Sequence, residues 1–510
     1  MRADARIASG PVRQRISLGA WLLLMVRIHP HLTVLIVVGV AMRVVTMVAF
    51  QPALLLHADA YGYLRVADDL EPSPPRPSLY PLLLRLVYPF HSLLPVVVVQ
   101  HIAGLAMAIG VYALLKKLGV GPFGSAVGSA PLFLDAYQLN IEHYVLSETL
   151  FQVLVLGALF LIAAPRTPSP RALVLAGFLL GLSGITRVTG VVLLGPVILY
   201  LLWKRVGLKP IAACLGAALI PLLSYATWFY LVWGDFALTS RGSLIFFGRV
   251  SPFADCRTES LPEYQRVLCD VRQPSDRPGT EFYVWRILHP LSPLRDFEPP
   301  RGKELDDVLS DFSRRIVIAQ PFDYARVVGG DLLHYFAPGR WEGERDAQQE
   351  QWEFADTPDL GPDDVATLNA LKATGDNLPK VIRDYRGSPE PTGLWGDEPP
   401  PKFEIVGPFA RFLDGYQDIV YTHGPLLALA TLLGCAGVVL RPVPGRRRSV
   451  RPEAFLFTAT GFALLFVPAA TAVFDYRYLL PAMPLLSLAG VLGAHTIEQH
   501  RRPPGRHLKL

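Results

Sequence analysis

Long apolar segments separated by short polar loops occupy both ends of this 510-residue chain. A helix of about 20 apolar residues crosses a hydrocarbon core roughly 30 Å thick, and slightly shorter runs can contribute to such a layer. Ten candidate segments lie near residues 31–51, 92–115, 121–138, 145–164, 171–187, 189–203, 209–233, 422–440, 453–473 and 477–496. The pattern predicts an all-α polytopic membrane protein with about ten transmembrane helices.

A polar segment, residues 234–421, interrupts this pattern. Apolar residues recur at helical spacing within 303–318 and 322–336, whereas 340–401 is acidic and rich in Pro and Gly. We expect a mainly helical insertion whose two periodic helices pack onto the membrane domain. The predicted domains are an N-terminal membrane domain (1–233, seven spans), the polar segment (234–421), and a C-terminal membrane domain with three spans and a basic tail (422–510).

Charge is distributed unevenly between these parts. The polar segment holds 21 Lys and Arg and 32 Asp and Glu, a net of −11, whereas the rest of the chain carries +16. Basic residues concentrate in cytoplasmic loops of multi-pass proteins, so the polar segment is expected outside the cytoplasm and both termini inside. The sequence therefore predicts a multi-pass plasma-membrane protein with its chemistry on the outer side.

Composition narrows the functional classes. Only 18% of residues are charged and the mean hydropathy is +0.33, which excludes an ordinary soluble enzyme. The basic residues are dispersed among the loops, so we expect membrane lipids as partners and no nucleic acid. No glycine-rich phosphate loop or nucleotide fingerprint is evident, which argues against a nucleotide-sugar donor.

The four cysteines divide into two pairs. Cys214 and Cys435 fall inside apolar segments, where a thiol behaves as a small hydrophobe. Cys256 and Cys269 fall in the polar segment, and we expect them to form a disulfide in an oxidising compartment. The histidines and cysteines lack metal-ligand spacing, so no metal and no other cofactor is expected.

Ionisable residues gather at the expected outer ends of the spans. Several of them lie in the first outer loop, residues 52–91, which we call loop 1. They are Asp59, Asp68, Asp69, Asp135, Glu142, Glu148, Arg187, Asp475 and Arg477. Charges beside apolar spans are costly, so their common side is a site hypothesis. Each of them alone could equally be a solvated loop end, and Asp59 could cap a helix.

Several short motifs, taken in order, resemble the glycosyltransferase C superfamily, and within it the polyprenyl-phosphate-sugar-dependent members such as protein O-mannosyltransferases and aminoarabinose transferases. The motifs are Arg43 in the first span, Asp59 with Tyr61 or Tyr63, Arg76-Pro77-Ser78-Leu79-Tyr80-Pro81, Ser147-Glu148, Thr186-Arg187 and Arg477-Tyr478-Leu479-Leu480-Pro481. The resemblance covers the membrane domains and says little about residues 250–415.

This resemblance implies an inverting transfer in which Asp59 deprotonates the acceptor hydroxyl. Members of the superfamily often carry a second acidic residue directly after this aspartate, but Ala60 stands here. A second acid or acceptor contact is therefore left to Asp135, Glu142 or Glu148, with no choice among the three.

The residue types suit this chemistry on physical grounds as well. Cleavage of the glycosyl bond leaves negative charge on the lipid phosphate, which a preorganised arginine stabilises. The candidates for this contact are Arg187, Arg477, Arg241 and Arg76. In the alternative interpretation Arg187 reaches the interface from a span end and Arg477 pairs with Asp475.

Two further residues have expected roles. Arg43 lies within a span, and we interpret it as half of a structural ion pair, with Asp59 as the candidate partner. Tyr80 is a packing or interface aromatic that could border a sugar pocket.

The sequence thus favours a glycosyltransferase that moves a hexose or pentose from a polyprenyl-phosphate carrier to an envelope glycan, lipid or protein outside the cytoplasm. The chief alternative is a transporter or flippase of a lipid-linked or anionic solute. It has less support because neither two related halves nor polar residues near the membrane midplane are evident in the sequence. A non-catalytic glycan-binding assembly partner is the third possibility.

Overall fold

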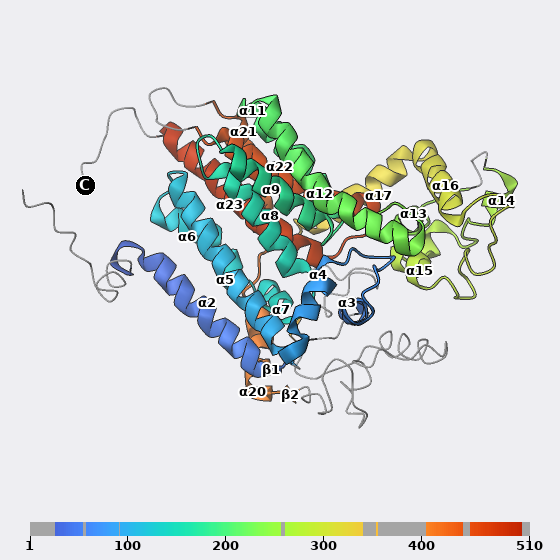
Figure 1. Ribbon diagram of the computed structural model, residues 1–510, viewed down its shortest axis with the longest axis horizontal. Helices are drawn as coiled ribbons and strands as arrows, with labels where there is room; N and C mark the ends of the chain where they lie inside the picture. Colours follow the sequence, from blue (N-terminus) through green and yellow to red (C-terminus); the bar gives the residue numbers. More distant parts are fainter. Residues whose placement is uncertain are drawn as a thin grey trace, which may run out of the picture.

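The computed structural model is mostly helical, with almost no strands among the residues that it describes (Figure 1). The residues that it describes are 26–54, 58–90, 92–256, 261–339, 353–354, 404–441 and 449–501. Most of the acidic 340–401 loop and of the basic C-terminal tail therefore lies outside the described residues. Within them, five helices are long and apolar enough to cross a membrane. They are α2 (Pro30–Ala49), α5 (Leu94–Lys117), α12 (Leu208–Trp233), α22 (Arg451–Thr471) and α23 (Tyr476–Arg501).

Shorter apolar helices fill the spaces between the long ones, and each falls within a segment that the sequence predicts to be helical. They are α6 (Pro122–Leu134), α8 (Glu148–Ala163), α9 (Pro170–Gly184), α10 (Thr189–Val192), α11 (Leu194–Trp203) and α21 (Gly424–Val439). Of the expected 121–138 span, only 122–134 is one continuous helix, because Asp135 ends α6 and starts α7 (Ala136–His143).

Local sequence explains where several of these helices begin and end. Ser169 caps α9 by accepting a hydrogen bond of 3.2 Å from the amide of Ala172, and Pro170 occupies the first turn. The end of α12 is set by Gly234, whose φ of +81° is the left-handed conformation that favours glycine.

Small residues bring α9 and α12 into close contact. A Cβ atom added to Gly177 would lie 1.9 Å from the carbonyl oxygen of Cys214, and one added to Gly181 would lie 2.2 Å from that of Ala218. The two helices run parallel, because the second contact lies further along the chain than the first in α9 and, by the same number of residues, in α12. Packing of this kind is typical of membrane helices, where close backbone approach replaces hydrophobic burial as the source of association.

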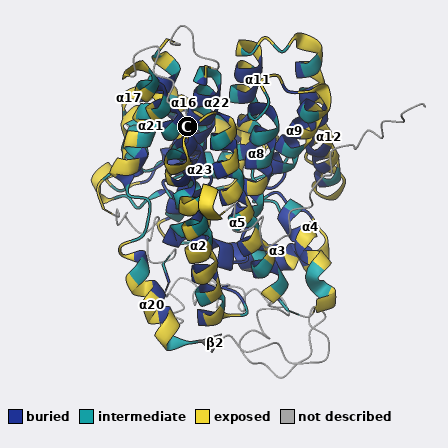
Figure 2. Ribbon diagram, turned by 90° about the vertical axis from the view of Figure 1, so that its left-hand side faces the viewer, coloured by how far each residue is buried: buried dark blue, intermediate teal, exposed yellow. Residues whose placement is uncertain are grey.

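Burial within the bundle is graded from its centre to its surface (Figure 2). Most of α23 is buried, whereas α2 exposes apolar side chains such as Val34, Val37 and Val44 along one side. An exposed apolar helix face of this length is unusual in water but ordinary in contact with lipid. The fold is consistent with an all-α membrane protein.

Loop 1 folds back against one end of the bundle. It contains α3 (Ala58–Asp69), α4 (Leu79–Leu84) and the 3₁₀ helix η1 (Arg85–Phe90). The only two strands among the described residues, β1 (Phe50–Gln51) and β2 (Glu404–Ile405), pair antiparallel beside it, with Phe50 opposite Ile405. The helix α20 (Gly407–Gln417) follows β2 and packs against α2.

Part of the polar segment forms a helical subdomain that projects from this same end (Figure 1). Its elements are α13 (Gly242–Val250), α14 (Glu263–Arg266), η2 (Pro274–Asp276), α15 (Thr280–Trp285) and α16 (Leu305–Ala319). It has its own core, separate from that of the bundle, which includes Phe247, Tyr283 and Phe312. Cys256 and Cys269 form the disulfide that the sequence predicts.

The two helices predicted near 303–318 and 322–336 are confirmed as α16 and α17 (Pro321–His334). The expectation that both pack onto the membrane helices holds only for α17, whose Tyr324 hydroxyl donates to the carbonyl of Ala470 at 2.9 Å. The apolar stripe of α16 faces α13 in the subdomain core instead. Periodicity identifies an apolar stripe but not the partner that covers it.

Candidate active site

Asp59 is the centre of a buried group of charges at the loop end of the bundle. It lies in the first turn of α3 and is 2% exposed. Arg477, at the start of α23, donates from Nη1 to Oδ2 of Asp59 at 2.6 Å. Arg76, which lies between α3 and α4, forms an ion pair with the other oxygen, Oδ1. Both carboxylate oxygens are therefore engaged by guanidinium groups from separate parts of the chain.

Glu148, the first residue of α8, extends this group of charges. Its Oε1 pairs with Arg187, which follows α9, and lies 3.6 Å from Nε of Arg477. Its other oxygen, Oε2, is buried and has no hydrogen-bond partner among the described residues. Asp475 completes the group, with Oδ2 at 3.5 Å from Nε of Arg477.

We call these six residues the site cluster: Asp59, Arg76, Glu148, Arg187, Asp475 and Arg477. It contains as many carboxylates as guanidiniums, so its formal charge is zero. Neutrality matters here because an unpaired charge at this burial would cost several kcal/mol.

Aromatic rings hold the arginines in place. The ring of Tyr478 lies 5.4 Å from Cζ of Arg187 and 5.6 Å from Cζ of Arg477, so one tyrosine contacts both guanidiniums. Trp285, at the end of α15, lies 5.8 Å from Cζ of Arg76 and brings the helical subdomain to the edge of the cluster. Cation–π contacts of this kind orient arginine without occupying its N–H donors.

Tyr63 and Tyr80 pack against each other close to Asp59. The Tyr63 hydroxyl lies 3.0 Å from Oγ of Ser147, and its ring meets that of Tyr80 edge to face at 5.3 Å. Burial, followed by the charges of Asp59 and Glu148, raises the pKa of Tyr63, so this hydroxyl stays protonated. Tyr80 is 4% exposed and its hydroxyl donates to Oε1 of Gln100 at 2.8 Å. That hydroxyl is thus engaged within the protein, which confirms the packing role that the sequence predicts for Tyr80, whereas its place at the border of a sugar pocket stays a prediction.

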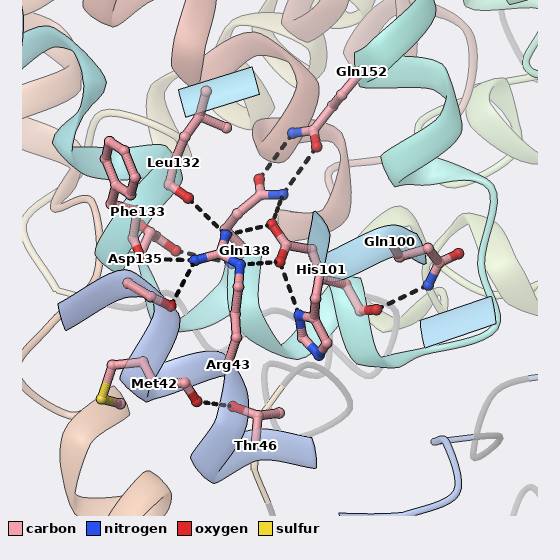
Figure 3. A network of polar contacts seen from close by, with 12 residues as sticks. Met42, Arg43, Thr46, Gln100, His101, Leu132, Phe133, Asp135, Gln138 and Gln152 are labelled. Carbon is pink, nitrogen blue, oxygen red and sulfur yellow. Dashed lines mark hydrogen bonds and ion pairs between the residues drawn. The ribbon is translucent and has the colours of Figure 1, made fainter. Parts of the chain in front are cut away.

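Arg43 belongs to a second, separate buried network (Figure 3). Its Nε and Nη2 donate to the two carboxylate oxygens of Glu142, each at 2.8 Å, and it also donates to the carbonyls of Gly39, Leu132 and Phe133. The expected structural ion pair exists, but the expected partner, Asp59, is wrong. The sequence could not reveal this, because α7 is a short helix that turns Glu142 inward between the spans.

The other two candidates for a second carboxylate serve the fold. Glu142 is held by Arg43, His101 and Gln138. Asp135 caps α7 by accepting from the amide of Gln138 at 3.2 Å, and it also accepts from the amide of Thr422 at 2.6 Å. Of the three acidic candidates, the structure brings only Glu148 to the site cluster.

Arg241 is likewise outside the cluster. It precedes α13 and has no ion pair with any residue that the structure describes. Three of the four arginines chosen for phosphate contact are therefore brought together, and the fourth is not. Within the described part of the chain, no group of three or more His, Cys, Asp or Glu residues is arranged to hold a metal ion.

Two features of the site escaped sequence reasoning. One is Tyr478, whose ring contacts both Arg187 and Arg477 and whose position directly after Arg477 was the available signal. The polar pair Gln100-His101 inside the apolar run of α5 was the available signal for the second network, because polar side chains within a span seek partners.

No protein-family model, curated protein or solved structure matches this chain.

Proposed function

We propose that this protein is an inverting glycosyltransferase that moves a monosaccharide from a polyprenyl-phosphate carrier to an acceptor outside the cytoplasm. The proposal includes ten spans, cytoplasmic termini and an extracytoplasmic polar segment in the plasma membrane. The acceptor is an envelope glycan, a lipid or a protein. The observation that carries the proposal is the convergence of Asp59 with Arg477, Arg187 and Arg76 at one end of the bundle.

The opposite end of the bundle supports this orientation. Lys204 pairs with Glu453 at 3.2 Å, and Arg451 lies over Trp203, so the end of α11 and the start of α22 are neighbours there. Lys116 and Lys117 end α5. These basic residues sit where the positive-inside rule expects the cytoplasm, and the site cluster lies at the other end.

In the proposed reaction, Asp59 acts as the general base. It takes the proton of the acceptor hydroxyl as that oxygen attacks the anomeric carbon of the donor sugar. The bond from the anomeric carbon to the phosphate oxygen breaks, and its electrons leave with the lipid phosphate. A positioned carboxylate contributes about 10²–10⁴-fold to such a proton transfer.

Arg477 and Arg187 are the proposed phosphate ligands. Their guanidiniums flank the same tyrosine ring and are held by Glu148, so both are positioned before a donor arrives. Arginine binds phosphate through paired N–H donors, which stabilises the charge that develops as the bond breaks. One preorganised donor of this kind is worth about 10²–10³-fold in rate.

Donor binding and activation of Asp59 are coupled in this scheme. Without the donor, Arg477 and Arg76 occupy both oxygens of Asp59. A phosphate that draws Arg477 toward itself releases Oδ2 of Asp59 for the acceptor hydroxyl. The base would then become available only when the donor is in place, which protects the lipid-linked sugar from attack by water.

Glu148 is the proposed second carboxylate. It positions Arg187 and Arg477 through Oε1, while Oε2 has no partner among the described residues and can accept a hydrogen bond from a hydroxyl of the sugar or the acceptor. A buried polar atom without a partner costs about 1–3 kcal/mol, and a substrate hydroxyl would remove that cost.

The test uses full-length protein in liposomes with a panel of polyprenyl-phosphate-linked hexoses and pentoses and an extract of envelope acceptors. Mass spectrometry identifies the products, and a parallel assay follows movement of the labelled lipid between leaflets. The proposal expects a new glycosidic product from at least one donor. Movement of the lipid-linked sugar without any transfer would overturn it in favour of the flippase alternative.

A further inference from the structure

A chain of hydrogen bonds connects the second buried network to the start of loop 1. Oε2 of Glu142 lies 3.0 Å from Nδ1 of His101, Nε2 of His101 lies 3.1 Å from Nδ1 of His143, and Nε2 of His143 lies 2.6 Å from the carbonyl oxygen of Phe50. All three side chains are buried. The chain is separate from the site cluster, and its chemistry does not depend on the proposed function.

The number of protons in this series of hydrogen bonds is fixed by the groups at its two ends, the carboxylate of Glu142 and the carbonyl oxygen of Phe50. A carbonyl oxygen only accepts, and so does an ionised carboxylate. Three hydrogen bonds therefore need three protons, whereas two neutral imidazoles supply two. The third proton must come from solution, and it makes either an imidazolium or a protonated carboxyl group.

Arg43 from α2 is a charged neighbour of these hydrogen bonds, through its ion pair with Glu142. Asp135 at the start of α7 accepts from the amide of Thr422, and Tyr416 from α20 donates to the carbonyl of Leu134, so their hydrogen bonds are made elsewhere. Because Arg43 and Glu142 balance each other, the extra proton is favoured by the hydrogen bond that it completes.

The position of the proton within the chain follows from its surroundings. Burial, and then the charge of neighbouring His101, lower the pKa of His143 to about 3, so His143 is the neutral member. It donates from Nε2 to Phe50 and accepts from His101 at Nδ1. The added proton is then shared between Nδ1 of His101 and Oε2 of Glu142.

We propose that Glu142 and His101 form a buried proton-binding site, with His143 as the neutral link that transmits the bound proton's hydrogen bond to Phe50. Occupation of this site completes the attachment of β1, and through it loop 1, to α5 and α7. Without the proton, one of the three contacts has an acceptor facing an acceptor and is no longer a hydrogen bond. The attachment of β1 therefore weakens.

Other contacts place this site at a junction between the fold and loop 1. The side-chain amide of Gln100 donates to the carbonyls of Glu142 and Tyr144, at 2.9 and 2.8 Å, while its oxygen accepts from Tyr80. Gly104 leaves room for the Glu142 carboxylate on α5, because a Cβ atom there would lie 1.9 Å from Oε1. The protein thus encloses Glu142 closely on the side facing α5.

The experiment is magnetic resonance of the wild-type full-length protein in liposomes, with ¹⁵N-labelled histidine and ¹³C-labelled glutamate. It is performed about two pH units above the ordinary histidine pKa of roughly 6.5, where exposed imidazoles are neutral. The proposal expects one remaining buried proton, seen as a single imidazolium or as a single protonated glutamate carboxyl. Spectra with every imidazole neutral and every carboxyl ionised would overturn it.

Two variants assign the signal. In Glu142→Gln the amide can donate to Nδ1 of His101, so the chain is complete without an added proton and the signal should vanish. The matched control is Glu453→Gln, because Glu453 is also buried and ion-paired but lies at the other end of the bundle. The signal should persist there. Persistence in Glu142→Gln would overturn the assignment to this site.

Discussion

Arg477 and Asp59 are 418 positions apart in the chain, yet a hydrogen bond of 2.6 Å joins Nη1 of Arg477 to Oδ2 of Asp59. The contact ties the start of the most buried long helix, α23, to the first helix of loop 1. Arg477 also approaches Glu148 and Asp475. One guanidinium thus connects three carboxylates, and its removal should change the whole site cluster.

Replacement of Arg477 by lysine is predicted to reduce glycosyl transfer about 10²–10³-fold. Lysine keeps the positive charge but lacks the planar, bidentate donors that reach two groups at once. The measurement is the initial rate with the active lipid-linked donor from the panel. Arg315→Lys is the matched control, because Arg315 forms an ion pair with Asp311 on the surface of α16. Equal rates in the two variants would remove Arg477 from the mechanism.

Gly104→Ala is predicted to lower the stability of the fold by about 3–5 kcal/mol, the usual cost of breaking a buried ion pair. The new methyl group would overlap Oε1 of Glu142 and displace its carboxylate from Arg43. Thermal unfolding in detergent measures the change. The control is Gly216→Ala in α12, where an added Cβ meets no atom within 4 Å. A similar melting temperature for both variants would contradict the tight enclosure of Glu142.

The helical subdomain is predicted to lose stability at acid pH, in part because Asp270 becomes protonated. Burial opposes ionisation of this carboxyl, but hydrogen bonds from Arg272 and Tyr283 outweigh it, so the pKa of Asp270 lies below its ordinary value. A lowered carboxyl pKa contributes stability above the unfolded pKa of about 4, and that contribution is lost as the pH falls through the folded pKa.

Denaturant unfolding, followed by amide exchange in α13 and α16, measures this contribution at neutral and at acid pH. Asp270→Asn should lose less stability between the two conditions than the wild type. The control is Asp276→Asn in the exposed helix η2, which should behave as the wild type does. The same acid sensitivity in all three proteins would show that Asp270 does not contribute.

The lengths of the apolar segments predicted much of the helical arrangement. The segment near 209–233 became α12 almost residue for residue, because a long apolar run bounded by Gly207 and Gly234 leaves few alternatives. The segment 121–138 did not become one helix, since the carboxylate of Asp135 competes for the backbone amide of Gln138 and starts a new helix.

The candidate site was predictable in part for a similar reason. The sequence places Asp59, Glu148 and Arg187 at the ends of spans on one expected side of the membrane, which predicts that they lie near one another. Sidedness cannot say which carboxylate meets which arginine, because pairing depends on helix rotation and on short turns such as α7. That is why the partner of Arg43 was wrong, and why Arg241, although in the same segment of chain, has no ion pair with the described residues.

The most direct test of the proposed mechanism compares Asp59→Asn with Asp69→Asn in the transfer assay. Both residues lie in α3, but Asp69 is exposed at its end whereas Asp59 is buried between two arginines. The mechanism predicts that Asp59→Asn lowers the transfer rate at least about 10²-fold at normal expression and folding, while Asp69→Asn retains the wild-type rate. Full transfer activity in folded Asp59→Asn would contradict the role of Asp59 as the base.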